Sequence, residues 1–186
     1  MPDDALAAEL VTDLPGSYER VVVAYQDRLY RFALRMCGNA ADARDITQEA
    51  FVRAYRALLR YSPERRRALA LQAWLYRITL NLTRNHVSRR RPAGVPLESL
   101  NGYEPHATDT PATVLLGSER RRVLERVIAG LPERYRAPVV LRHVEALTYE
   151  EAAAVLRQPV GTTKANVHRG LALLRRALEE GRETKR

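Results

Sequence analysis

The clearest hydrophobic pattern in the chain lies in residues 74–91, which read WLYRITLNLTRNHVSRRR. On a helical wheel this segment divides into two faces, because side chains three and four positions apart share one side of a helix. The apolar face consists of Leu71, Trp74, Leu75, Ile78 and Leu82. No acidic side chain lies on the polar face, which consists of Arg77, Asn81, Arg84, Asn85 and Ser88. We therefore predict a helix that presents one face to a protein core and the other to a partner.

The polar face has two interpretations. Guanidinium groups bind phosphates and side-chain amides bond to base edges, so the face suits nucleic acid. An ordinary amphipathic helix with a solvated basic face shows the same pattern, and the stripe alone favours neither interpretation. The rest of the chain has to decide between them.

Two more amphipathic helices are predicted ahead of this segment. The first begins at Ser17 and ends at Gly38, and its apolar positions are Tyr18, Val22, Tyr25, Leu29, Phe32 and Met36. The second follows Asn39, which can serve as its N-cap, and its apolar positions are Ile46, Ala50, Phe51, Ala54 and Leu58. Its outer side presents Asp45, Gln48, Glu49 and Arg53.

Two segments beside these helices receive a different prediction. Residues 1–16 hold acids and no base, and we predict a mobile acidic tail in which a short helix is possible. In residues 61–70 the helical period is broken at Pro63, so a loop is predicted. Its Arg65, Arg66 and Arg67 could grip phosphates, and a solvated loop is an equal alternative.

The composition changes at residues 92–118, which contain four prolines and no lysine or arginine. We predict an extended acidic linker there. It separates a first helical domain, residues 17–91, from a second, residues 119–180, which a short tail, 181–186, follows. Because no segment of any length has the period of a strand, the predicted fold class is all-α: two small helical domains joined by an extended linker.

The second domain carries the signature of a helix-turn-helix. Helices are predicted from Arg120 to Ala129 and then through Tyr135 and His143. Thr148 with Glu151 forms a capping box ahead of a short helix, 149–156. A glycine-containing turn, 157–161, leads to a last helix that ends near residue 179 and turns inward Val167, Leu171, Leu174 and Leu178. In this motif the first residues of the second helix point at base edges, here Thr162, Thr163, Lys164, Asn166, His168 and Arg169.

The charge balance favours a polyanionic partner. Lysine and arginine number 31 against 22 acids in 186 residues, a net charge of +9, and nucleic acid is the commonest partner of such a surplus. The apolar runs are far shorter than the ~20 residues that span a bilayer, and the N-terminus lacks the pattern of a signal peptide. Cys37 is the single cysteine, which excludes an internal disulfide and fits a cytoplasmic protein without membrane insertion.

Catalytic chemistry is not indicated by any motif. The four histidines show no metal-ligand spacing, and neither HExxH, CxxC nor a glycine-rich phosphate loop is present. We therefore expect a protein that is not an enzyme, with no catalytic residues, no bound metal and no cofactor.

Taken together, these stretches resemble a bacterial RNA polymerase sigma factor of the sigma-70 family, extracytoplasmic-function type. Residues 42–51, DARDITQEAF, are similar to the family's polymerase-binding helix. Residues 74–78, with Asn81 and Asn85, look like its promoter-melting helix, which reads the −10 element. Residues 131–133, 147–151 and 159–162 look like the domain that reads the −35 element. Their order along the chain, with the acidic linker between them, makes the resemblance specific.

The resemblance implies a role in transcription initiation, in a stress or envelope regulon. It implies three partners: core RNA polymerase, through its β′ clamp helices and β flap, promoter DNA, and an anti-sigma factor. The clamp helices would meet Asp45, Gln48, Glu49 and Arg53. Segment 61–69 would receive a flipped base, and the acidic linker would thread the polymerase's RNA-exit path. The residues expected to bind −10 DNA are Tyr61, Arg65, Arg66, Arg77, Asn81, Arg84, Asn85 and Ser88. The −35 DNA would meet Thr162, Thr163, Lys164, Asn166, His168 and Arg169.

Two other functions are compatible with the same residues. A conventional helix-turn-helix transcriptional regulator with a helical N-terminal sensor domain would bind duplex promoter DNA tightly without polymerase. A non-specific RNA-binding helical protein would show salt-sensitive binding without promoter preference.

Overall fold

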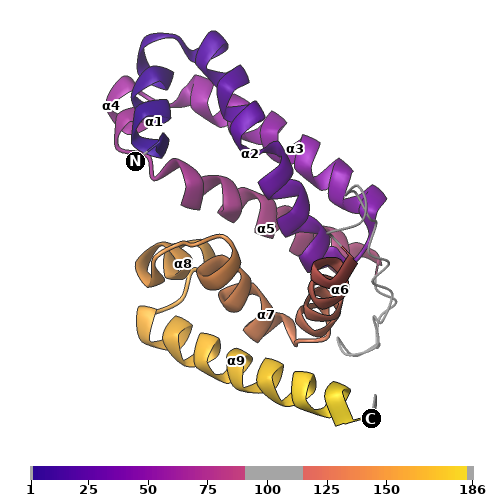
Figure 1. The fold of residues 1–186 in the computed structure, drawn as a ribbon. Helices are drawn as coiled ribbons and strands as arrows, with labels where there is room; N and C mark the ends of the chain where they lie inside the picture. Colours follow the sequence, from indigo (N-terminus) through magenta and orange to yellow (C-terminus); the bar gives the residue numbers. More distant parts are fainter. Residues whose placement is uncertain (1, 91–114, 184–186) are drawn as a thin grey trace. The chain divides into compact units, whose positions relative to one another are not determined.

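The computed structural model describes residues 2–90 and 115–183, and every regular element in these two ranges is a helix (Figure 1). The predicted all-α fold class is thereby confirmed for the described part of the chain. Two compact units are present, one made of Met1–Cys37 and Ala41–Arg90, the other of Gly38–Ala40 and Arg91–Arg186. Most of the predicted linker, residues 92–114, lies outside the described residues.

The first unit is organised around three long helices, α2 (Leu14–Cys37), α3 (Ala40–Arg60) and α5 (Leu71–Arg90). On α2 and α5, the rings of Phe32 and Tyr76 meet edge to face with their centroids 5.0 Å apart. Tyr18 joins α2 to α3, because its hydroxyl donates a 2.6 Å hydrogen bond to the carbonyl oxygen of Phe51. Burial raises the pKa of that hydroxyl well above its ordinary value.

The predicted core positions of this unit are largely correct. All the apolar positions expected to face inward on α3 are buried. On α2 the core position is Val21, which is fully buried, whereas Val22 is half-buried. His86 of α5 also faces α3: its Nε2 lies 3.2 Å from Oδ1 of Asp42, without the alignment of a hydrogen bond.

The N-terminal residues are folded, which corrects the prediction of a mobile acidic tail. Helix α1 (Pro2–Thr12) lies against α2, and Leu6, Leu10 and Leu14 are buried. Leu6 and Leu10 lie one turn apart on one face of α1, and Leu14 continues the four-residue spacing at the start of α2. The acidic composition of the segment therefore concealed a regular apolar stripe.

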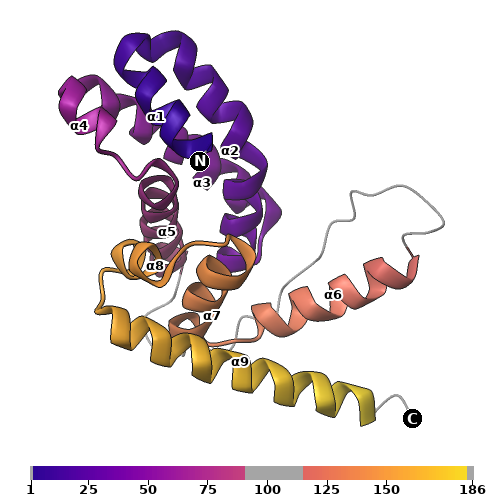
Figure 2. The ribbon, with the colours of Figure 1, turned by 60° about the vertical axis from the view of Figure 1, so that its left-hand side comes forward.

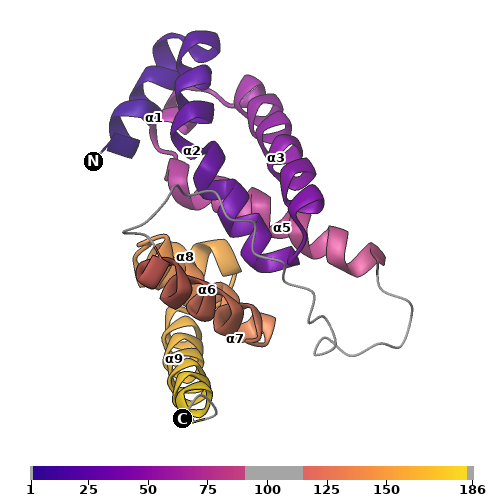
Figure 3. The same ribbon diagram turned by 45° about the vertical axis from the view of Figure 1, so that its right-hand side comes forward.

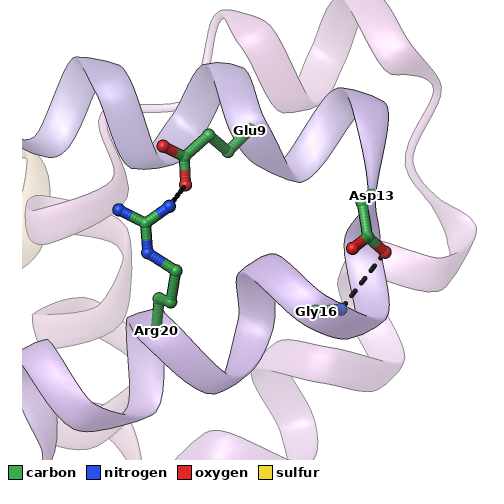
Figure 4. A network of polar contacts seen from close by, with 4 residues as sticks. All are labelled: Glu9, Asp13, Gly16 and Arg20. Atoms are coloured by element: carbon green, nitrogen blue, oxygen red, sulfur yellow. Dashed lines mark hydrogen bonds and ion pairs between the residues drawn. The ribbon is translucent and has the colours of Figure 1, made fainter.

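Polar contacts fasten the junction between α1 and α2 (Figure 4). Glu9 of α1 forms an ion pair with Arg20 of α2. Between the two helices, a carboxylate oxygen of Asp13 accepts a 3.2 Å hydrogen bond from the backbone N–H of Gly16. Glu9 and Asp13 thus form contacts within the fold and do not belong to a solvated tail.

Residues 61–70, predicted as a loop, contain the short helix α4 (Pro63–Arg67). Ser62 is its N-cap and accepts a 3.3 Å hydrogen bond from the backbone N–H of Arg65. Hydrogen bonds from its own backbone N–H and from Ser62 hold the pKa of the Glu64 carboxyl below its ordinary value. Proline breaks the interior of a helix but favours its first position, so Ser-Pro-Glu here marks a helix start.

The second unit contains α6 (Leu115–Ala129), α7 (Glu133–Val139), α8 (Tyr149–Leu156) and α9 (Val160–Glu183) (Figure 2). Helices α6, α7 and α8 each contact α9. Two bounds differ from the prediction: α6 begins at Leu115, within the residues assigned to the linker, and α9 continues past residue 180 to Glu183.

The helix predicted through His143 changes type part-way. It is α-helical to Val139 and then π-helical over Val140–Val144, where the N–H of Glu145 donates to the oxygen of Val140 at 3.0 Å. Pro138 lies just before the change. Because proline has no N–H to donate, one α-helical hydrogen bond is missing there. The sequence did not predict that the helix continues as a π-helix from this point.

The predicted capping box at the start of α8 is confirmed. The N–H of Thr148 donates to Oε2 of Glu151 at 2.7 Å, and the N–H of Glu151 donates to Oγ1 of Thr148 at 3.1 Å. The turn after α8 differs from the predicted glycine turn. Arg157 takes the left-handed conformation, with a φ of 54°, and Gly161 lies in the first turn of α9.

Glycine is needed farther along α9, where this helix crosses α7. A Cβ atom at Gly170 would lie 2.6 Å from Cγ2 of Val139 and 3.2 Å from the oxygen of Tyr135. The two backbones therefore approach more closely than any side chain permits. Leu171, which was predicted to face inward, is 36% exposed beside it, because the glycine occupies the contact position.

We predict that Gly170→Ala lowers the free energy of unfolding by roughly 1–3 kcal/mol, because the added methyl overpacks a closed helix contact. The matched control is Gly161→Ala, since a Cβ at Gly161 meets nothing within 4 Å. That control should be stabilised by about 0.5–1 kcal/mol, because alanine favours a helix over glycine. Urea unfolding followed by circular dichroism measures both. An equal gain in stability for the two variants would contradict the close crossing of α7 and α9.

Candidate DNA and polymerase interfaces

The course of helix α5 can be followed in Figure 3. Its predicted polar face carries the more exposed side chains of this helix. Arg84, Asn85 and Ser88 are exposed, and Arg77 and Asn81 are half-buried one to two turns earlier. The structure thus brings the five predicted side chains to one side of one rigid helix. No acid occurs anywhere in Leu71–Arg90, so the face is uniformly cationic or neutral.

The buried part of α5 is wider than the apolar stripe that the sequence shows. Besides the predicted Leu71, Trp74, Leu75 and Leu82, the buried residues include Tyr76, Thr79, Leu80 and Thr83, whereas the predicted Ile78 is half-buried. Both threonines donate their hydroxyls to carbonyls of their own helix, Thr79 to Leu75 at 3.0 Å and Thr83 to Thr79 at 2.8 Å. A threonine satisfied in this way packs much like a valine, which is why a simple polar/apolar reading missed it.

An aromatic and cationic stack lies beside the start of α5. The ring of Tyr61 is 6.0 Å from that of Trp74, and the guanidinium carbon of Arg65 is 3.8 Å from the centroid of Tyr61. Arg65 is exposed, whereas Trp74 is buried. The structure therefore joins two of the predicted −10 residues, Tyr61 and Arg65, in one contact, with a flat ring and a charge together. Arg67 of the same arginine run, predicted as a possible phosphate contact, is also exposed.

Arg66, which was predicted to contact DNA, donates hydrogen bonds to the protein backbone. Its Nε donates to the oxygen of Leu58 at 2.9 Å and its Nη1 to the oxygen of Leu10 at 3.3 Å. The side chain is half-buried, and its guanidinium is committed to the protein backbone. A guanidinium engaged in this way holds parts of the fold together, and a contact between Arg66 and DNA stays a prediction.

The outer face of α3 presents the side chains predicted to bind polymerase. Asp45, Gln48 and Arg53 are exposed and Glu49 is half-buried. Nε of Arg53 lies 2.6 Å from Oε1 of Glu49, an ion pair one helical turn long. Such an exposed pair contributes about 0.3–0.5 kcal/mol, so the stripe is available for a partner at little cost to the fold.

The first turns of α9 present most of the residues predicted to face −35 DNA. Thr162, Lys164, His168 and Arg169 are exposed, and Asn166 is half-buried. Nζ of Lys164 lies 5.4 Å from the ring centroid of Tyr149, on α8. The α9 sequence has no acid before Glu179, so this end of the helix is cationic.

Thr163 corrects the predicted set. It is fully buried, and its hydroxyl accepts a 2.9 Å hydrogen bond from Nε2 of Gln158 and donates one of 3.2 Å to the oxygen of Pro159. A side chain with both hydrogen bonds satisfied inside the turn has no surface left for a base. Thr162 and Thr163 are the same residue type, so the sequence does not distinguish them. The structure does, because Thr163 is buried in the turn and Thr162 is exposed.

Tyr149 is a contact residue of this site that the sequence did not reveal. Besides Lys164, the guanidinium carbon of Arg142 lies 5.0 Å from its ring centroid. Cation–π contacts of this kind orient a long, flexible side chain. Arg142, Tyr149 and Lys164 lie on three different helical segments, so a helical wheel of one segment does not group them.

Neither a membrane-spanning helix nor a metal centre is found in the described residues. None of the helices is long and apolar enough to cross a bilayer. No three histidine, cysteine or acidic side chains there gather closely enough to hold a metal ion.

Comparison with protein families matches a known family region to each of the two units. The model of Sigma-70 region 2 matches residues 21–92, and that of Sigma-70, region 4 matches residues 121–174. The class of protein is therefore that of sigma-70-type factors with these two regions, in the order in which the two helical units follow each other along the chain.

Individual relatives narrow the class. The extracytoplasmic-function sigma factor SigW of Bacillus subtilis is 33% identical over 88% of this chain and 90% of its own length. SigE of Mycolicibacterium smegmatis is 35% identical over 94% of this chain and 68% of its own. A solved structure of CnrH, in complex with the cytosolic domain of CnrY, is 25% identical, covers 96% of this chain and 97% of that one, and gives a TM-score of 0.68. The chain belongs to the extracytoplasmic-function sigma factors of the sigma-70 family.

The difference between two neighbouring threonines provides a test of the α9 site. Thr163→Val keeps the shape but leaves Gln158 without its acceptor, and we predict a loss of roughly 1–3 kcal/mol in the free energy of unfolding. Thr162→Ala, at an exposed position, should change it by less than about 0.5 kcal/mol. Urea unfolding measures both variants. If Thr163→Val unfolded like the unaltered protein, the buried hydrogen-bond pair would have no structural weight.

Proposed function

We propose that the chain binds core RNA polymerase and directs it to promoters, which it recognises and melts at the start of transcription. The observation that supports this proposal is the occurrence of two acid-free, basic helix stretches, Leu71–Arg90 on α5 and the start of α9, in separate units. A protein that reads two promoter elements needs one such surface for each. This role involves no catalysis by the chain itself, and it places the protein in the cytoplasm, where bacterial transcription occurs.

The first unit would handle the −10 element as a single strand. Taking a base out of the stack costs a few kcal/mol, which stacking on an aromatic ring and hydrogen bonds to the base edge can offset. Tyr61 and Arg65 supply a flat ring and a cation in contact. Asn81 and Asn85 supply amides on the accessible face of α5, and Arg77, Arg84 and Ser88 lie along the same face, where they can hold phosphates.

The second unit would hold the −35 element as a duplex. A recognition helix enters the major groove with its first turns, where Arg and Lys pair with guanine and Asn with adenine. On α9 these are Lys164, Asn166 and Arg169, with Thr162 and His168 beside them. Tyr149 supports Lys164 from α8, so that the ammonium is held near the start of the helix.

Protein partners would use other surfaces. The α3 stripe of Asp45, Gln48, Glu49 and Arg53 suits the β′ clamp helices, because its acids would repel phosphate but can pair with basic side chains. The second unit would dock on the β flap. An anti-sigma factor is a further expected partner, which the solved complex of the similar CnrH with CnrY supports by analogy.

Two rival functions make different predictions for one experiment. A conventional helix-turn-helix regulator binds its operator without polymerase, and an RNA-binding protein binds without promoter preference. The test is a pull-down of core RNA polymerase by the purified protein, followed by run-off transcription from a genomic promoter library. Polymerase capture and start sites that depend on the protein are the expected result. Tight, sequence-specific DNA binding by the free protein, without polymerase capture, would overturn the proposal.

We predict that the double variant Gln48→Ala, Glu49→Lys abolishes capture of core polymerase while the helical content stays unchanged. The two side chains lie on the outer face of α3, and the ion pair that is lost is exposed. The measurement is the pull-down together with circular dichroism.

The matched control for this variant is Glu180→Lys. It also breaks an exposed arginine–glutamate pair one turn long, because Nε of Arg176 lies 2.9 Å from Oε1 of Glu180 on α9. The control should capture polymerase normally. Unchanged capture by the α3 variant would exclude this stripe as the docking site.

The two DNA-facing helices should divide promoter opening between them. We predict that Asn81→Ala and Asn85→Ala lower open-complex formation but barely change closed-complex binding, because they remove contacts to single-stranded bases. Lys164→Ala and Arg169→Ala should weaken the closed complex, and Arg169→Ala should relax preference within the −35 element alone. The loss of one base-reading side chain costs ~1–3 kcal/mol of discrimination at one position.

Reconstituted holoenzyme on promoters mutated in one element at a time separates these effects. Closed complexes are measured by filter binding and melting by permanganate reactivity. Normal melting by the Asn81→Ala protein, or altered −10 preference in the Arg169→Ala protein, would contradict the assignment of helices to promoter elements.

A further inference from the structure

Helix α4 has no hydrophobic anchor of its own. None of its residues, Pro63–Arg67, is buried, and a helix of this length is not stable in isolation. It nevertheless lies against α1, and the chain runs from it directly into α5 (Figure 1). Something other than apolar burial must therefore hold the segment that carries Arg65 and follows Tyr61.

The guanidinium of Arg66 supplies this attachment. Its two hydrogen bonds, to the oxygens of Leu58 and Leu10, end in the last turns of α3 and α1. Carbonyls in the last turn of a helix carry the negative end of the helix dipole, where a cation is stabilising. One side chain thus joins the ends of two helices to α4.

The same carbonyl also fixes the other end of the segment. The oxygen of Leu58 accepts a 3.2 Å hydrogen bond from the backbone N–H of Tyr61, in addition to the bond from Arg66. The oxygen of Arg66 in turn accepts one of 3.2 Å from the N–H of Leu69. Tyr61 and Arg66 therefore share one acceptor at the end of α3, and the backbone of Arg66 is bonded to the segment that leads into α5.

We propose that Arg66 is a positioning residue for recognition of the melted −10 strand, and that α1 takes part in this recognition through it. The inference rests on the proposed function. Arg66 would not touch DNA. It would hold Tyr61 and Arg65 where a flipped base can stack, and α1 would supply one of the two carbonyls to which its guanidinium donates.

The structural half of the proposal is tested on the free protein. Hydrogen exchange of peptide 61–70 should become about tenfold faster in Arg66→Ala, because two hydrogen bonds are lost. Arg66→Lys should behave like Arg66→Ala, since one ammonium does not reproduce a fork that spans two carbonyls. The exposed neighbour variant Arg67→Ala is the control and should exchange like the unaltered protein. Trp74 is the single tryptophan, so its fluorescence quenching by acrylamide reports the same loosening independently. Unchanged exchange and quenching in Arg66→Ala would overturn the proposal.

The functional half uses holoenzyme on a promoter identified by the run-off experiment. Arg66→Ala and Arg66→Lys should both lower permanganate-detected melting by about tenfold and reduce preference at the flipped base, with closed-complex binding unchanged. A phosphate contact would give the opposite pattern, because Arg66→Lys keeps the charge and would melt nearly normally. If the unaltered protein captured no polymerase, the proposed function would fail, while the exchange experiment would still decide the role of Arg66.

The contribution of α1 is tested with a proline in its exposed face. Ala8→Pro removes a backbone N–H and disrupts α1 at an exposed position, so the Leu10 carbonyl is displaced. It should speed exchange of peptide 61–70, and adding Arg66→Ala should change that rate little further. Ala8→Ser is the control and should leave the rate unchanged. Fully additive effects of Ala8→Pro and Arg66→Ala would show that α1 does not act through Arg66.

Discussion

The first unit depends on the enclosure of α5, which is buried on most of its circumference and accessible on one polar face. Its Tyr76 ring packs against Phe32 of α2, and its buried threonines satisfy their hydroxyls on their own helix. A helix held in this way cannot rotate without exposing apolar surface, at roughly 25 cal/mol per Å². The backbone that carries the amides and guanidiniums of its open face is therefore fixed, which would limit the entropy lost on the proposed binding of nucleic acid.

The second unit reaches the same result by different means. The start of α9 is set by the capping box before α8, by the left-handed Arg157 and by the buried Thr163, which ties Gln158 to the first turn of α9. Farther along, Gly170 lets α9 approach α7 backbone to backbone. The exposed side chains from Thr162 to Arg169 are thus carried by a helix whose origin and crossing are both fixed.

How much of this the sequence predicts depends on the kind of interaction. Period and caps are local, so the long helices, the inward face of α3 and the Thr148–Glu151 box were predicted correctly. The hydrogen bonds that Thr163 and Arg66 form within the protein were not predicted, because each depends on partners that a helical wheel does not contain. For Arg66, one of these partners, the oxygen of Leu10, is 56 residues away along the chain. The N-terminal helix was predicted only as a possibility within a mobile tail, because acidic composition outweighed a leucine at every fourth position. The separation of Tyr149, Arg142 and Lys164 in sequence likewise hides a contact that exists only in three dimensions.

The signs of the exposed charges sort the surfaces by partner. Neither Leu71–Arg90 nor the part of α9 before Glu179 contains an acidic residue, whereas the outer face of α3 carries Asp45 and Glu49. Phosphate is repelled by such carboxylates and attracted by guanidinium, so the α3 stripe is unsuited to DNA and suited to a protein with basic side chains. The net charge of +9 alone would attract nucleic acid without selecting which surface of the protein binds it. Under the proposed function, the acids of the α3 stripe and the acid-free stretches of α5 and α9 would let polymerase and promoter bind to different surfaces of the same protein.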